Sequence, residues 1–104
     1  MIICTTDKVE GKTITETLGL VKGTIVQSKH IGRDVMAGLK TIVGGEIKGY
    51  TEMLNEARNT ATERMIEEAK QLGADAIVGV RYGTSEATQG AAEIFAYGTA
   101  VKLK

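Results

Sequence analysis

The chain contains one cysteine, Cys4, and one histidine, His30, and these are its best metal-ligating side chains. A structural zinc site is built from four Cys or His ligands, which usually come in closely spaced pairs. Cys4 and His30 lie 26 residues apart, and neither has such a neighbour. We therefore interpret Cys4 as a small apolar residue of a strand and His30 as an exposed loop residue. Both stay weak metal candidates, because a rotation axis in a homo-oligomer would multiply either residue into a ring.

Nucleophilic catalysis needs a serine or cysteine that is activated by a nearby base. His30 is the only imidazole in the sequence, and no GxSxG pattern is present. Carboxylates such as Asp34 and Glu93 are available for acid–base chemistry, but isolated acidic residues are typical of a solvated surface. We predict no catalytic residue, and we favour a non-enzymatic chain over an enzyme.

Four polar side chains are the candidates for lining a ligand pocket: Arg33, Asp34, Tyr50 and Arg81. Arg81 alternates with Ile77 and Gly79 on one face of a predicted strand, where a guanidinium group needs a carboxylate partner. Asp34 or Glu93 would supply it. A salt bridge within or between subunits is favoured over ligand binding.

The glycines of the segment 44–49 precede a predicted helix, and backbone N–H groups at such a position favour anions. The sequence lacks both GxxxxGK[ST] and a GxGxxG pattern between a strand and a helix. A hinge between two helices is therefore the preferred interpretation of this segment.

These residues have to be positioned by a single domain, 1–104, of the α+β class. The predicted order is β-β-α-α-β-β, with a mainly antiparallel sheet and both helices on one face. Apolar periodicity and turn residues give the expected elements: strands at 1–6, 13–28, 74–82 and 92–102, helices at 33–43 and 50–72, and a loop at 83–90. In the strand 13–28 the apolar phase slips near Gly23, as a β-bulge, a plain bend or burial of both sides of the strand would produce.

The helix 50–72 is the most strongly patterned element. Its apolar stripe follows helical spacing: Tyr50, Leu54, Ala57, Ala61, Met65, Ala69 and Leu72. Gly73 follows at once and suits the left-handed position after a helix end. Ala57 and Ala61 are small, so we expect this helix to lie directly on the sheet.

Composition limits the partners of the chain. Thirteen basic residues balance thirteen acidic ones and form no cluster, so no nucleic acid is expected. The apolar runs are far shorter than the roughly 20 residues of a membrane span. No signal peptide is visible and a single cysteine cannot form an internal disulfide. We therefore expect a cytoplasmic protein without a membrane partner.

The predicted partner is a second copy of the chain. The segment 76–80 is apolar at every position, and Phe95 and Tyr97 alternate with Ile94 and Ala96, so both faces of the sheet look buried. The helices cover one face only. A homo-oligomeric binding or assembly module is therefore the leading hypothesis. A small enzyme with an active site between subunits is the alternative, and a purely structural ring is a third.

Several motifs resemble the small bacterial YbjQ-like family over essentially the whole chain: Arg33-Asp34, Gly44-Gly45, Tyr50, Ala57-Arg58, the passage Leu72–Tyr82 and the closing Tyr97–Val101. The resemblance implies a dodecin-like α+β fold and assembly into ring-like homopentamers. The family carries the label "putative heavy-metal-binding domain", so a metal is the one cofactor that the resemblance implies. Its ligand is otherwise unknown.

Overall fold

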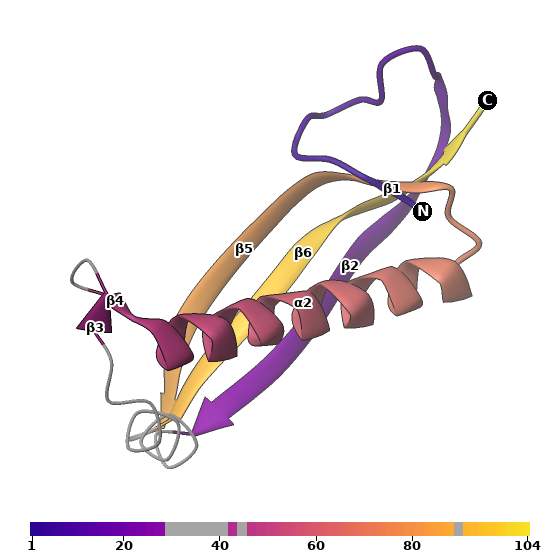
Figure 1. Cartoon of the computed structure of the whole chain (residues 1–104). Coiled ribbons are helices and arrows are strands. Elements are labelled where there is room, and N and C mark those ends of the chain that lie inside the picture. Colours follow the sequence, from indigo (N-terminus) through magenta and orange to yellow (C-terminus); the bar gives the residue numbers. More distant parts are fainter. Residues whose placement is uncertain (29–41, 44–45, 89–90) are drawn as a thin grey trace.

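A computed structural model describes residues 1–28, 42–43, 46–88 and 91–104 of the chain. Figure 1 shows one long helix lying across one face of a twisted sheet. The elements, in chain order, are β1 (Ile2–Ile3), β2 (Ile14–Ser28), β3 (Ile42–Val43), β4 (Glu46–Ile47), α2 (Lys48–Gln71), β5 (Ala76–Thr88) and β6 (Ala91–Leu103). A small α+β fold is confirmed.

The main sheet has four strands in the order β1-β5-β6-β2. β6 pairs antiparallel with both β5 and β2, so β2 and β5 run in the same direction on either side of it. β1 pairs parallel with β5. β3 and β4 form a separate antiparallel pair next to the start of α2. The sheet is therefore mixed, and the long connection from β2 to β5 contains α2.

Two of the predicted element boundaries are wrong. The helix expected over 33–43 does not reach its predicted end, because Ile42 and Val43 form β3; the rest of that prediction lies outside the described residues. The loop expected over 83–90 is wrong up to residue 88, because β5 continues to Thr88. Thr84 and Thr88 are β-branched and suit an extended backbone. Thr84, Ser85 and Glu86 are exposed, so polar side chains can be accommodated in this part of the strand.

The N-terminal segment follows β5 further than the two residues of β1 indicate. The Cys4 N–H donates to the carbonyl of Ile77, and the Val80 N–H donates to the carbonyl of Cys4. The Gly79 N–H then donates to the carbonyl of Thr6. Gly79 has a φ of 62°, so the pairing is irregular at this point. The predicted strand 1–6 is thus shortened to Ile2–Ile3 by a bulge in its neighbour.

The phase slip in β2 is real, but its predicted place is wrong. Gly23 pairs regularly with Ala96, whereas the register shifts between Thr17 and Gly19. Gly19 has a φ of 121°, which a residue with a Cβ rarely adopts. Beyond this bulge the apolar residues on odd positions, beginning with Val21, face the helix.

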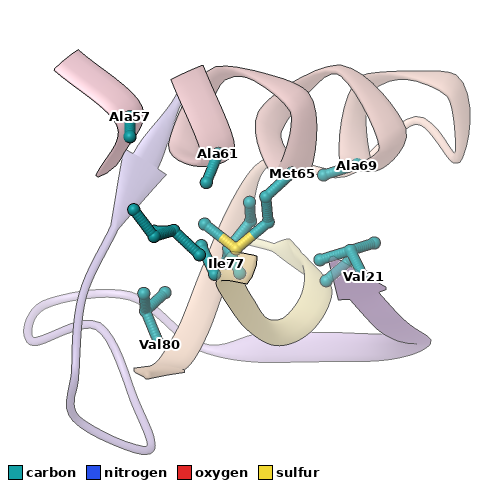
Figure 2. Close-up of a cluster of buried hydrophobic side chains, with 10 residues drawn as sticks. Val21, Ala57, Ala61, Met65, Ala69, Ile77 and Val80 are labelled. Atoms are coloured by element: carbon teal, nitrogen blue, oxygen red, sulfur yellow. The ribbon is translucent and has the colours of Figure 1, made fainter. Parts of the chain in front are cut away.

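The main core lies between α2 and the sheet (Figure 2). Its buried members are Val21, Ala57, Ala61, Met65, Ala69, Ile77, Val80, Ile94, Ala96 and Ala100. The predicted stripe of α2 is confirmed at its alanines and at Met65. A second cluster, formed by Ala76, Val78 and Val101, lies on the other face of the sheet. There the N-terminal segment covers it with Cys4 and Val9.

Candidate functional site

The predicted pocket residues are not brought together by the described part of the chain. Arg33, Asp34 and His30 lie outside the described residues. Tyr50 lies near the start of α2, and Arg81 lies in β5. Arg81 is therefore the candidate whose contacts can be examined directly.

Arg81 binds main-chain oxygens. Its Nη1 donates to the carbonyl of Thr5 at 3.0 Å and to the carbonyl of Val80 at 2.9 Å. Glu93, which we considered as its carboxylate partner, instead accepts a hydrogen bond of 3.3 Å from the Ser85 hydroxyl. Arg81 thus ties the N-terminal segment to β5, and its exposed guanidinium group keeps further donors for another acceptor.

Cys4 is half-buried beside the second core cluster. Its Sγ lies 3.8 Å from the carbonyl oxygen of Thr6 and 4.0 Å from that of Lys8. A thiol is a weak donor, so these contacts are weak, and carbonyl oxygens are poor ligands for a thiophilic metal. Within the described ranges, no group of three or more His, Cys, Asp or Glu side chains could hold a metal ion. The described residues therefore do not fit a heavy-metal centre.

The sheet face opposite α2 exposes several large side chains. Alternation along the strands places these side chains on it: Leu20, Lys22, Val26, Arg81, Phe95 and Tyr97. We call this set the open face. The exposed fraction is 66% for Leu20, 56% for Val26 and 40% for Tyr97. These large apolar side chains therefore contact water on one side of the sheet, with Lys22 and Thr24 between Leu20 and Val26 on β2.

The open face has an ordered arrangement across three strands. Tyr97 pairs with Lys22 on one side and with Arg81 on the other, so an aromatic ring lies between two cations. Phe95 is next along β6, and its ring centroid is 6.0 Å from that of Tyr97. Gly83 opposite Phe95 leaves room for this ring, because a Cβ there would approach ring atoms to 2.5 Å. The open face thus combines aromatic and aliphatic side chains with the two cations on either side of Tyr97.

The sequence predicted part of this surface. Phe95 and Tyr97 were expected to give the last strand a second apolar face, and this is confirmed by the alternation with buried Ile94 and Ala96. Leu20 and Val26 were missed. The signal was present in the phase slip of β2, because a bulge at Gly19 sends Leu20 to the face opposite Val21.

Across the described residues, no helix is long and apolar enough to cross a membrane. α2 has 24 residues. It is amphipathic, and its exposed side is charged.

Comparison with known proteins identifies relatives over the full length of the chain. The family model YbjQ_1, described as "Putative heavy-metal-binding", matches residues 1–104. A UPF0145 protein of Vibrio parahaemolyticus is 64% identical over 103 residues, which cover 99% of this chain and 98% of the relative. A UPF0145 protein of Thermotoga maritima is 62% identical over 104 residues, covering 100% and 98% respectively.

The fold is also similar to a solved structure. A crystal structure from Pediococcus pentosaceus, of a protein of unknown function in the DUF74 family, matches with a TM-score of 0.67. The match covers 100% of this chain and 98% of that one at 20% sequence identity, so it supports the fold alone. With a family model that spans every residue and relatives above 60% identity, the chain belongs to the YbjQ-like family.

Proposed function

We propose that this protein is a self-associating module and that its open face packs against a second copy of the chain. The observation that carries this proposal is the exposure of Leu20, Val26 and Tyr97 together on one sheet face. α2 covers the other face, and the N-terminal segment covers only the end formed by the second core cluster. Large apolar side chains gathered on one exposed face favour an interface in a soluble protein.

The dimensions of the chain support a second copy as the occupant. Its radius of gyration is 16.6 Å, whereas a compact domain of 104 residues has about 13 Å. Its accessible surface is 6806 Å², whereas a folded monomer of 11.1 kDa exposes about 5,700 Å². An elongated chain of this kind has surface that a second copy can bury.

Charge also permits self-association. The net charge of the chain is zero, so copies do not repel one another at long range. Both signs occur on this side of the sheet, because Lys22 and Arg81 pair with Tyr97 while Glu93, two residues beyond Phe95 on β6, pairs with Val26. A second copy can therefore supply counter-charges as well as apolar area.

The assembly that we propose is the dodecin-like ring of five expected from the family resemblance. In a ring each contact joins two different surfaces, and every copy uses both. The open face would be one of them. The number five comes from the resemblance and not from the geometry of the monomer.

Light scattering at micromolar concentration tests the proposal. We expect a mass of about five times 11.1 kDa for the wild type. Leu20→Asp and Val26→Asp should each shift the mass toward the monomer. Leu72→Asp is the matched control, because Leu72 is 45% exposed but lies at the end of α2. A wild-type mass near 11 kDa would exclude self-association, and a trimer or hexamer would exclude only the ring of five.

Heavy-metal binding is the second candidate function, because the family description names it. From the lack of paired ligands we expect zinc or copper to bind more weakly than about 1 µM, if at all. The measurement is metal content after dialysis of protein purified without chelators. Stoichiometric metal that is lost in Cys4→Ser or His30→Ala would show that our expectation is wrong.

A further inference from the structure

The outer edge of β2 is occupied by side chains of α2. The main-chain N–H of Lys22 donates to Oε1 of Glu68 at 3.3 Å, and the main-chain carbonyl of Thr24 accepts from Nη1 of Arg64 at 2.6 Å. In an antiparallel pair, alternate residues point their N–H and C=O groups away from the neighbouring strand. Lys22 and Thr24 are two such residues, because their bonds go to the helix and not to β6.

The distance between Arg64 and Glu68 along the helix matches the distance between their partners, Thr24 and Lys22, along the strand. Arg64 and Glu68 are one helical turn apart, a rise of about 6 Å. Lys22 and Thr24 are two residues apart in a strand, about 6.6 Å. The helix positions increase as the strand positions decrease, so both hydrogen bonds form at once. Arg64 and Glu68 therefore do more than form a pair within the helix.

Gly23 brings the helix close enough for this arrangement. A Cβ at Gly23 would lie 2.5 Å from the main-chain nitrogen of Met65 and 2.9 Å from the Cβ of Arg64. The helix backbone therefore rests on the strand between Lys22 and Thr24. From there the longer side chains of Arg64 and Glu68 reach over the edge.

We propose that Arg64 and Glu68 form an edge cap that prevents a second copy from adding its own β2 to this edge. β2 has 15 residues, and the sequence contains no proline. A long strand with free N–H and C=O groups is a template for open-ended growth. An added strand would have to displace both side chains. With this edge blocked, copies of the chain would associate through the open face. That consequence rests on the proposed function, whereas the edge cap itself does not.

Hydrogen exchange tests the cap directly. In Glu68→Ala we expect the amide of Lys22 to exchange about tenfold or more faster than in the wild type, because its acceptor is gone. Glu68→Gln retains an acceptor oxygen and should restore most of the protection. Glu67→Ala is the matched control on the same helix, where the side chain is exposed. Unchanged exchange at Lys22 in Glu68→Ala would overturn the proposal.

Fibre formation tests the consequence of removing the cap. We expect Arg64→Ala/Glu68→Ala to form fibres visible by electron microscopy at a concentration where the wild type forms none. Leu54→Ala is the control for aggregation caused by instability alone. Urea is added until the fraction of unfolded Leu54→Ala protein equals that of the double variant. A double variant that stays folded and forms no fibres would overturn the proposal. If it does not fold, the exchange result for Glu68→Ala decides.

The edge cap and the proposed function can fail separately. In a Leu20→Asp background the open face is disabled, yet removal of the cap should still produce fibres. Fibres together with a monomeric wild type would support the cap and exclude assembly through the open face. A wild-type oligomer with no effect of Arg64→Ala/Glu68→Ala would support assembly and exclude the cap.

Discussion

The two faces of the main sheet are packed by opposite means. On the face under α2, Gly23, Ala57 and Ala61 allow main chains to approach closely, and no aromatic ring is present in that cluster. On the open face, Phe95 and Tyr97 present large rings that Gly83 accommodates. Close backbone contact fills space within one chain, whereas large exposed rings gain most when another surface removes them from water. This difference is what we expect if one face stabilises the monomer and the open face serves the association proposed above.

Gly23→Ala should show the largest difference between the faces. Its Cβ would overlap the carbonyl of Ala61 and the nitrogen of Met65, which are main-chain atoms and cannot turn aside. We expect a loss of about 3 kcal/mol or more in the free energy of unfolding, at the upper end of overpacking. Urea titration followed by circular dichroism measures it.

Gly83→Ala is the matched control on the open face. Its Cβ would meet only the Phe95 ring, a side chain that can rotate away from the sheet. We expect it to cost under about 1 kcal/mol. Equal losses for Gly23→Ala and Gly83→Ala would mean that the two faces are packed with the same tightness.

Ala61→Leu should have the next largest effect. Ala61 is fully buried between α2 and the sheet (Figure 2), so the extra carbons have no free volume. We expect a destabilisation of about 1–3 kcal/mol in a denaturant titration. Asn59→Leu, on the exposed side of the same helix, should change stability by less than about 0.5 kcal/mol. A neutral Ala61→Leu would contradict the close packing of this face.

The face of the sheet under α2, called the helix face below, could be predicted from the sequence, because the patterns that indicate it lie within one short segment. The predicted helix 50–72 is found as Lys48–Gln71. Gly73 takes the left-handed conformation expected of it, with a φ of 78°. Leu72 departs from the predicted stripe, because the helix ends before it and its side chain is 45% exposed. Helical periodicity and a terminal glycine depend on few distant contacts, so predictions made from them agree with the structure.

The open face could be predicted only in part, because it depends on register between distant segments. Nothing near Lys22 in the sequence indicates that Tyr97 and Arg81 share its row. The continuation of β5 past Gly83 was missed because polar residues there resemble a loop. The edge cap is equally non-local, since Arg64 meets Thr24 across 40 positions. Residue types alone suggested a salt bridge for Arg81 and not its bond to the Thr5 carbonyl.

Tyr82→Phe should have the smallest effect and locates the limit of the helix face. Tyr82 follows Val80 on the side of β5 that faces α2, yet it is 46% exposed. Its hydroxyl lies 2.8 Å from the hydroxyl of Thr62. Thr62 already donates its hydrogen to the carbonyl of Arg58, so Tyr82 is the donor in this pair.

Removing that donor should cost about 0.5 kcal/mol, because water can replace it at an exposed site. A double-mutant cycle with Thr62→Val in urea unfolding isolates the coupling between the two hydroxyls from the separate bond to Arg58. A coupling above about 1.5 kcal/mol would mean that the helix face is closed to water as far as Tyr82. The water-excluded contact between α2 and β5 would then extend further along β5 than the 46% exposure of Tyr82 indicates.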